Sequence, residues 1–401
     1  MVTIDDIRDA EVRLRGVIRH PPAEESSTLS DLVGRQVFAK PEHLQRTGSF
    51  KIRGAYNCIR QIADAGIYTD VVAASAGNHA QGVALASRLS GMSSTIFMPE
   101  GASLPKLAAT RQYGATVHLG GVDLSECIQT AIAYAKSTGG IYVPPFDDPM
   151  VIAGQGTIGL ELADEVRSAE VIVVPVGGGG LISGVATAIK ALRPEVRIVG
   201  VEAAGAASLL SALAAGHPVS LPEVRTMADG IAVGAVSALT YEHVEAYVDD
   251  VVTVSEEEIS RALLVLLERS KWVVEPAGAV ALAALLAGKV EGSGPAVAIL
   301  SGGNVDPLLL RRLIEHGLSA AGRYLILRVV LDDRPGSLAT LTDALARLHV
   351  NVIEVEHHRS GALVAIAEVE VVMIVETRDA AHHDEIVAQL CEKGFQATAL
   401  V

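Results

Sequence analysis

Short apolar runs alternate with helical patterns through the middle of the chain, and this alternation constrains the fold more than any other feature. The apolar runs span residues 71–74, 95–98, 171–174, 197–201 and 296–300. Parallel strands need crossover connections, usually helices, so the alternation predicts an α/β fold with parallel sheets. Glycine-containing turns follow several of these runs directly, which indicates binding loops at the carboxyl ends of the strands.

The pattern changes after Gly322, where a second type of unit begins. Residues 324–331 indicate a strand and residues 337–348 an amphipathic helix. Two strands hinged at Ser360-Gly361, a helix near 380–393 and a last strand to Val401 follow. This βαββαβ order is the ferredoxin-like arrangement.

The length of 401 residues is sufficient for two or three units of about 100–200 residues each. We therefore expect a main domain over 1–320, with a smaller subdomain at roughly 45–150 inserted in it, and a C-terminal domain over 323–401. Half of the residues are hydrophobic but only 3% are aromatic, so small aliphatic side chains must fill the layers of this α/β protein.

The charge of the chain excludes several classes of partner. A net charge of −15, with no run of Lys or Arg, argues against nucleic acid and anionic membranes. Residues 1–6 lack a signal-peptide pattern, and the apolar stretch 278–288 is too short to span a bilayer, so a cytoplasmic protein is expected. Cys58, Cys127 and Cys391 are odd in number and far apart, which predicts neither disulfides nor a zinc site.

One lysine stands out in the sequence Ser-Phe-Lys-Ile-Arg-Gly-Ala. Lys51 lies between Arg46 and Arg53, and a lysine that is near other cations and partly desolvated loses its proton more readily. Such a lysine can form a Schiff base with an aldehyde. Taken alone the signal is weak, because most lysines in this setting are surface charges.

The segment 177–180 consists of four glycines between a buried strand and a helical run. The amides of such a loop, together with the helix N-terminus behind it, can hold a phosphate without a basic side chain. A dinucleotide site is the rival hypothesis, but Ile182 stands where its G-x-G-x-x-G fingerprint needs the third glycine. A turn without a ligand is the third possibility.

Two more strand ends carry polar groups, in Ser-Ala-Gly-Asn-His-Ala-Gln-Gly from Ser75 and Ser-Gly-Gly-Asn from Ser301. Read singly, His79 could be a core histidine and Ser301 a helix cap. Together with Lys51 and the four-glycine loop, these two strand ends favour a common ligand site.

These motifs resemble the fold-type II pyridoxal-phosphate family, and within it the threonine dehydratases, over essentially the whole chain. Phe146-Asp147-Asp148, Ile-Ala-Gly-Gln-Gly-Thr at 152–157 and Glu-Pro-Ala-Gly-Ala at 275–279 also resemble the dehydratases. The resemblance implies a tryptophan synthase β-like fold with two parallel-sheet domains. It also implies pyridoxal 5'-phosphate as the cofactor.

The resemblance assigns a role to each motif. Lys51 should hold the cofactor as a Schiff base and later remove the Cα proton, Asn78 should bond the ring hydroxyl, and Ser301 should face the pyridine nitrogen. The expected cofactor-binding residues are Phe50, Lys51, Asn78, Gly177, Gly178, Gly179, Gly180, Leu181 and Ser301. The expected substrate-binding residues are Ser75, Ala76, Gly77 and His79.

The reaction implied is conversion of L-threonine to 2-oxobutanoate and ammonia, and of L-serine to pyruvate. Serine racemases resemble the chain closely but carry a serine where this chain has Ala76, and alanine cannot supply a proton to the opposite face of a carbanion. A β-replacing enzyme and a non-catalytic amino-acid sensor are two further hypotheses, and Lys51 argues against the sensor. Ser208 replaces a carboxylate of the racemases' cation site, which leaves a monovalent ion near Glu202 as the remaining possibility.

The C-terminal unit resembles an ACT domain. Asp333, Arg334, Pro335 and Gly336, with Asn351 at the next strand, match the ligand-binding corner of those domains. Inhibition by isoleucine with relief by valine is expected of a biosynthetic enzyme, whereas a degradative enzyme would ignore both. The alternative is a domain that only dimerises. Because one copy is present, pairing must occur between subunits, which predicts a homodimer or homotetramer.

Overall fold

The structure is a computed structural model that describes residues 1–320, 322–359, 365 and 367–400. The chain divides into two compact units, Met1–Leu310 and Arg311–Val401. This division falls within α13 (Pro307–Ala320). The domain boundary expected at 320–323 lies at the C-terminal end of the same helix. No helix in the described residues is long and apolar enough to cross a bilayer.

The first unit contains two separate sheets, as the alternating pattern predicts. Among the described residues the larger sheet has the strand order β1 (Glu24–Glu25), β2 (Val37–Lys40), β10 (Ala296–Ile299), β7 (Val171–Pro175), β8 (Arg197–Ala203) and β9 (Asp250–Val254). Its pairings are parallel except that of the two-residue β1 with β2. Its central strands β7 and β10 are buried along their whole length, which explains their unbroken apolar sequences.

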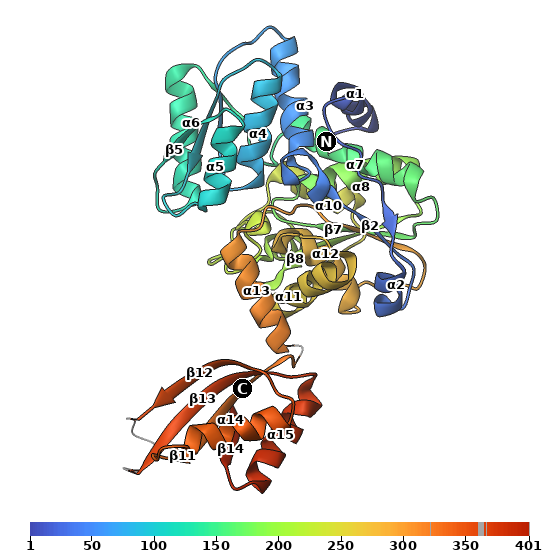
Figure 1. Cartoon of the computed structure of the whole chain (residues 1–401). Helices are drawn as coiled ribbons and strands as arrows, with labels where there is room; N and C mark the ends of the chain where they lie inside the picture. The colour runs from blue at the N-terminus through green and yellow to red at the C-terminus, as the bar shows by residue number, and fades with distance from the viewer. Residues whose placement is uncertain (321, 360–364, 366, 401) are drawn as a thin grey trace. The chain divides into compact units, whose positions relative to one another are not determined.

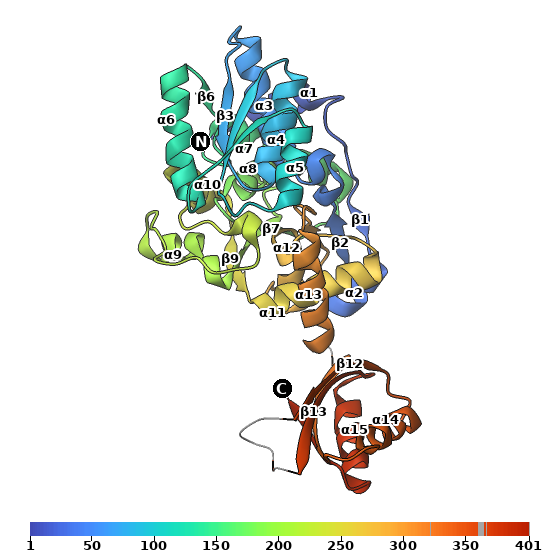
Figure 2. The same cartoon turned by 60° about the vertical axis from the view of Figure 1, so that its left-hand side comes forward.

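The smaller sheet is parallel throughout, with the order β5 (Thr116–Leu119), β4 (Ser94–Met98), β3 (Val71–Ala74) and β6 (Ile141–Tyr142). Helices α4 (Asn78–Leu89) and α6 (Leu124–Thr138) pack against β3 and β4. Both views show these helices with α5 (Leu104–Gln112) around the smaller sheet (Figures 1 and 2).

The remaining helices of the first unit surround the larger sheet and connect it to the smaller one. They are α1 (Ile4–Leu14), α2 (Ser27–Val33), α3 (Lys51–Asp64), α7 (Pro149–Glu165), α8 (Gly180–Leu192), α9 (Ser208–Ala215), α10 (Ala238–Tyr247), α11 (Glu256–Val265) and α12 (Pro276–Leu286). Short helical turns lie at η1 (Glu42–Leu44), η2 (Arg46–Gly48), η3 (Ala204–Ala206), η4 (Asp229–Ile231) and η5 (Leu266–Ser270). Of these turns, η1 and η2 directly precede α3, which begins at Lys51.

The second unit has the βαββαβ order that the sequence predicts. Its antiparallel sheet has the order β12 (Val352–His358), β13 (Glu368–Glu376), β11 (Tyr324–Asp332) and β14 (Gln396–Leu400), with helices α14 (Ser337–Arg347) and α15 (Ala380–Glu392). Alternate residues of β11 and β13, such as Leu327 and Val371, form a core with Leu345 and Leu390 of the helices. The expected hinge at Ser360-Gly361 lies outside the described residues.

The predicted fold class is confirmed, and the five apolar runs correspond to β3, β4, β7, β8 and β10. The strands that the apolar runs did not indicate are β1, β2, β5, β6 and β9. Strands β1 and β6 have only two residues and β5 is mostly exposed, so these three strands have neither an apolar run nor a clear alternation.

Helices α7 and α8 approach each other closely because both present glycines at their contact. A Cβ on Gly184 of α8 would overlap the carbonyl oxygen of Ile152 and lie 2.6 Å from the nitrogen of Gly156. A Cβ on Gly159 of α7 would in turn lie 2.9 Å from the carbonyl oxygen of Val185. The glycines therefore set the distance between the helix that follows the four-glycine loop and its neighbour.

We expect Gly184→Ala to lower the free energy of unfolding by about 1–3 kcal/mol, because the added methyl group forces backbone apart in a closely packed contact. Urea denaturation should show the lowered midpoint. Gly101→Ala is the matched control, since a Cβ there meets nothing within 4 Å. Equal stability of the two variants would contradict this account of the α7–α8 contact.

Candidate active site

Lys51 begins α3, and its side chain is partly buried. The amine donates a hydrogen bond to the carbonyl oxygen of Pro145 at 2.8 Å and lies 5.2 Å from the centre of the Phe50 ring. Burial lowers the pKa of Lys51 to about 8, against an opposing effect of the Glu275 carboxylate. A larger fraction of the amine is therefore uncharged near neutral pH than in an ordinary lysine, and the uncharged form is the one that reacts with an aldehyde.

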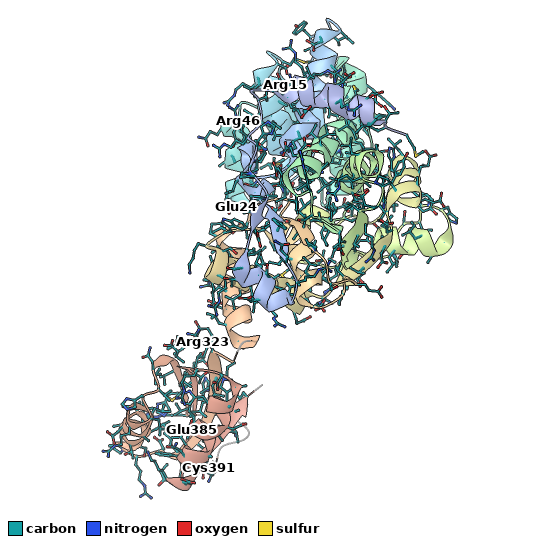
Figure 3. All side chains as sticks on the ribbon, turned by 90° about the vertical axis from the view of Figure 1, so that its right-hand side faces the viewer. Arg15, Glu24, Arg46, Arg323, Glu385 and Cys391 are labelled. Atoms are coloured by element: carbon teal, nitrogen blue, oxygen red, sulfur yellow. The ribbon has the colours of Figure 1, made fainter. Side chains whose placement is uncertain are left out.

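The arginines beside Lys51 are not the cause of this shift. Arg46 is exposed at the surface (Figure 3). Arg53 is fully buried and forms ion pairs with Glu42 at 2.7 Å and Glu161 at 2.6 Å. The interpretation that neighbouring cations activate Lys51 is therefore wrong, because one arginine points to solvent and the other is neutralised by two carboxylates.

The four glycines form the turn between β7 and α8. A Cβ would lie 2.9 Å from the Ile231 Cα if placed on Gly177 and 2.8 Å from the Phe146 Cβ if placed on Gly180. Gly179 has a φ of 89°, a conformation that favours glycine. The turn thus brings backbone amides to the N-terminus of a 13-residue helix, an arrangement that binds phosphate groups.

The segment Pro145-Phe146 connects Lys51 with this loop. The carbonyl of Pro145 accepts the hydrogen bond of Lys51, while the ring of Phe146 occupies the space beside Gly178 where a Cβ would lie. The Lys51 amine and the glycine loop at the N-terminus of α8 therefore border the same place in the fold. Pyridoxal phosphate needs both groups, an amine for its aldehyde and amides for its phosphate, so the residues present fit it.

The side-chain amide of Asn78 forms hydrogen bonds with two other side chains. Its amide nitrogen donates to Glu275 at 2.6 Å, and its amide oxygen accepts from Asn304 at 2.7 Å. Asn304 also donates to the carbonyl oxygen of Thr47 at 2.6 Å. The second N–H of Asn78 stays available for an acceptor such as the ring hydroxyl of the cofactor.

Glu275 is buried, and burial raises its pKa to about 7. The charge of Asp229 adds to the rise, whereas Lys106 and the hydrogen bond from Asn78 oppose it. A carboxyl group that changes its charge near neutral pH therefore contacts a predicted cofactor-binding residue.

The loop of Ser75, Ala76 and Gly77 leads into α4, a helix of 12 residues. The Ser75 hydroxyl oxygen accepts from the Gly77 amide at 3.1 Å. His79 donates from Nε2 to the carbonyl of Val143 at 2.9 Å, and burial with the nearby Lys51 charge lowers its pKa to about 3. The imidazole is thus neutral, and the loop offers an anion the amides of a helix N-terminus.

Ser301 follows β10 and is 3% exposed. Its carbonyl accepts from the amide of Phe50 at 3.1 Å, and Ser49 pairs with Gly302 in an isolated antiparallel bridge. The Ser301 hydroxyl has a long contact of 3.4 Å to the carbonyl of Ala277. Ser301 therefore lies beside the segment that carries Lys51, as the sequence motifs suggest.

Family comparisons agree with this geometry. Residues 14–302 match the model described as pyridoxal-phosphate dependent enzyme, and residues 325–392 match the ACT domain. The chain belongs to the pyridoxal-phosphate dependent enzymes. Its second unit is an ACT domain.

Individual relatives extend the match to the whole length of this pyridoxal-phosphate dependent enzyme. It is 46% identical over 397 residues to L-threonine ammonia-lyase of Thermotoga maritima, which covers 99% of both chains. A solved structure of threonine deaminase isoform 2 from Solanum lycopersicum has a TM-score of 0.72 and 37% identity over 78% of this chain and 93% of that one. Maize serine racemase has a TM-score of 0.74 and 36% identity over 80% of this chain and 98% of its own.

Several residues of the site had no predicted role. Pro145, Phe146, Glu275 and Asn304 lie within or beside motifs that the sequence does show, but their contacts come from distant segments. The ion pair of Lys106 with Asp229 has no recognisable sequence signal. Its two residues are 123 positions apart in segments without a motif.

The predicted effector corner is divided in the structure of the ACT domain. Asp333 follows β11, where its amide donates to the carbonyl of Ala367, and Gly336 precedes α14. Asn351 lies at the other end of the sheet, where its carbonyl accepts from the amide of Glu376, the residue opposite Tyr324. β11 and β12 run in the same direction and begin at the end opposite the 333–336 loop, so the two parts of the expected corner lie apart within one chain. Effector binding between two ACT domains, as the sequence resemblance implies, stays a prediction.

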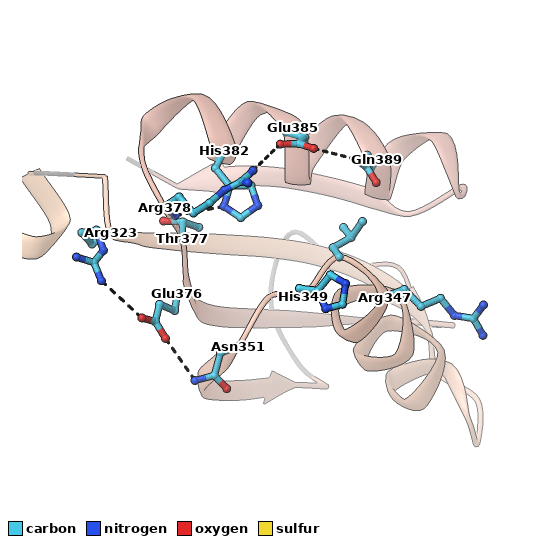
Figure 4. A pocket seen from close by; sticks show the side chains of 11 residues that line it. Arg323, Arg347, His349, Asn351, Glu376, Thr377, Arg378, His382, Glu385 and Gln389 are labelled. Atoms are coloured by element: carbon cyan, nitrogen blue, oxygen red, sulfur yellow. Dashed lines mark hydrogen bonds and ion pairs between the residues drawn. The ribbon is translucent and has the colours of Figure 1, made fainter.

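A cavity of about 730 Å³ lies at the Asn351 end of the ACT domain (Figure 4). Arg323 and Asn351 approach Glu376 at 3.7 Å and 3.5 Å on one side of it. Arg378 pairs with Glu385 at 3.1 Å on the other side. The lining therefore carries both charge signs, as a zwitterionic ligand would need.

The side chain of Glu202 caps the N-terminus of α9. Its two carboxylate oxygens accept from the amides of Leu209 and Leu210 at 2.8 Å and 2.9 Å, and burial raises its pKa to about 7. The hydroxyl of Ser208 beside it is buried without a partner. The described residues contain no group of three His, Cys, Asp or Glu side chains suited to a metal ion, and a monovalent ion at Glu202 stays a prediction.

The raised pKa of Glu275 predicts a pH dependence of stability. A carboxyl with a raised folded-state pKa stabilises the fold below its ordinary pKa of 4.5, and this contribution is lost as the pH rises through about 7. Glu275→Gln should therefore gain stability relative to the unchanged protein between pH 5 and pH 8, by an amount on the order of 3 kcal/mol.

Urea denaturation of both proteins at the two pH values measures this difference. Glu100→Gln, at an exposed position, is the control and should show no such gain. A Glu275→Gln variant whose relative stability is the same at pH 5 and pH 8 would show that Glu275 does not titrate in this range.

Proposed function

We propose that this enzyme converts L-threonine to 2-oxobutanoate and ammonia, and L-serine to pyruvate and ammonia. The observation that carries the proposal is the partly buried amine of Lys51 beside a glycine loop at a helix N-terminus. A relative named L-threonine ammonia-lyase, 46% identical over 99% of both chains, supports the choice of substrate.

The cofactor roles follow from the positions of the side chains. Lys51 would hold pyridoxal phosphate through its amine, residues 177–181 would bind the phosphate, and Asn78, Phe50 and Ser301 would surround the ring. When bound, pyridoxal phosphate withdraws electrons from the Cα of the amino acid attached to it. A serine at the ring nitrogen, unlike a carboxylate, would not hold that nitrogen protonated, which favours elimination over transamination.

The remaining steps belong to residues of this chain. The amides of the 75–79 loop bind the substrate carboxylate at the N-terminus of α4. The Lys51 amine, with a pKa of about 8, is suited to take the proton from Cα as general base. Loss of the β-hydroxyl then gives an enamine that water converts to the 2-oxo acid and ammonia.

Serine racemisation is the second candidate, because the solved structure of maize serine racemase resembles this chain with a TM-score of 0.74. Racemisation needs a proton donor on the face opposite Lys51. Ala76 occupies the position where the racemases carry a serine, and its methyl group cannot donate a proton. The alanine at position 76 therefore favours elimination.

The ACT domain supports a proposal of regulation by an amino acid. Asn351 and the 333–336 loop are the expected effector-binding residues, and pairing of two ACT domains in a homodimer or homotetramer would supply both to one site. We also infer that the enzyme works in the cytosol, which its unpaired cysteines favour.

We expect Lys51→Ala to lower 2-oxo-acid formation at least about 1,000-fold, because the variant loses the cofactor link and the general base together. The yellow colour of the bound cofactor should disappear while the circular dichroism spectrum stays unchanged. Lys136→Ala, at an exposed lysine, should keep full activity. Retained deamination by Lys51→Ala would overturn the assigned role.

A steady-state assay with isoleucine and valine tests the substrate and the regulation. We expect rapid 2-oxobutanoate release from L-threonine, inhibition by isoleucine and relief of that inhibition by valine. Turnover that ignores both effectors would point to a degradative enzyme or another ligand. D-serine formation from L-serine, faster than pyruvate release, would instead favour the racemase.

A further inference from the structure

Lys106 places a cation beside the middle of the 75–79 loop. It lies in the first turn of α5, where its side chain is 10% exposed and pairs with Asp229 of η4, which is 55% exposed. The Lys106 ammonium lies 3.9 Å from the position that a Cβ on Gly77 would take. A nearly buried positive charge therefore borders the predicted substrate-binding loop.

The loop itself provides no full positive charge. Its sequence is Ser-Ala-Gly-Asn-His, and the His79 imidazole is neutral at pH 7 because burial lowers its pKa to about 3. The amine of Lys51 is occupied by the cofactor link in the proposed function. The Glu275 carboxyl beside Asn78 would repel an incoming carboxylate whenever it is ionised. The amides alone would have to offset the charge of an amino-acid substrate.

Lys106 and Asp229 are close enough to the site to affect its electrostatics. Both act on the pKa of the buried Glu275, Asp229 raising it and Lys106 lowering it. Asp229 is more than half exposed, so it can turn to solvent at little cost, whereas the Lys106 ammonium stays enclosed and needs a negative partner.

We propose that Lys106 binds the α-carboxylate of the substrate, and that Asp229 is its partner only until the substrate arrives. The proposal rests on the proposed function, which places the carboxylate at the 75–79 loop. Lys106 is then a specificity residue, since it selects amino acids that carry a free carboxylate over amines that do not.

The attachment of α5 does not depend on this ion pair alone. Ser103, directly before α5, donates to Asp306 at 2.6 Å and joins the start of the helix to the segment before α13. Leu107 and Thr110 of α5 are also buried. A Lys106→Met variant, which keeps the aliphatic stem, should therefore keep the position of the helix.

Steady-state kinetics of the holoenzyme with L-threonine provide the first test. Lys106→Met should raise KM by about 10- to 100-fold with a smaller change in kcat, the loss expected for one charge-assisted hydrogen bond. Lys106→Arg should retain most of the affinity, and Lys136→Met, at an exposed lysine, should match the unchanged enzyme. An unchanged KM in Lys106→Met would overturn the proposal.

The Asp229→Asn variant distinguishes binding of the substrate carboxylate by Lys106 from a purely structural role of the Lys106–Asp229 ion pair. If Asp229 competes with the substrate for Lys106, its removal should leave KM at or below that of the unchanged enzyme. If the ion pair only holds the two halves of the unit together, Asp229→Asn and Lys106→Met should both raise KM. An increase of KM in both variants would contradict the proposal.

Titration of the cofactor absorbance with L-threonine and with L-threoninamide, which lacks the carboxylate charge, gives a readout that needs no turnover. Lys106→Met should weaken binding of L-threonine and leave binding of the amide unchanged; equal weakening of both would contradict the role assigned to Lys106. Absence of 2-oxo-acid release from the unchanged enzyme would contradict only the proposed function, since the titration still decides the role of Lys106.

Discussion

The buried ion pairs of Arg53 are the interaction on which the active site depends most. Arg53 lies two residues after Lys51 and is enclosed together with Glu42 and Glu161, and Lys40 adds a second buried cation. Removing one partner from such a group leaves an unpaired charge in the interior, so the group holds only when all its members are in place. It ties the start of α3 to η1 and α7, and thereby fixes where the Lys51 amine can be.

The sequence was sufficient for the parts of the fold and the site that depend on local patterns. Buried strands such as β7 and β10 are continuous apolar runs because both of their faces are covered, and each ends in a turn whose glycines or small polar residues are visible as a motif. The segments that carry Asn78, the four glycines and Ser301 could be found in this way, whereas the signal at Lys51 was weak without the resemblance of its motif. The rule that parallel strands present their carboxyl ends at one edge groups the four glycines with Ser301, which follow β7 and β10 of the larger sheet, whereas Asn78 follows β3 of the smaller sheet.

The contacts that tune these groups could not be predicted, because they join segments far apart in the chain. Glu275 meets Asn78 across 197 positions, and the Pro145 carbonyl meets Lys51 across 94. The sequence showed two arginines beside Lys51 but not that one is exposed and the other neutralised. It also showed the residues of the effector corner but not the strand directions that separate them, because strand order in the ACT domain depends on pairing rather than on local pattern.

That separation links effector binding to assembly. β11 has nine residues, so the 333–336 loop and Asn351 are about 25–30 Å apart along the sheet, far more than an amino acid can span. A ligand that touches both can do so only where two ACT domains run in opposite directions, each supplying one part. Its affinity then depends on the concentration of the protein itself, and the ligand in turn favours the associated form by mass action. If a ligand binds in this way, dilution of the enzyme would weaken its binding.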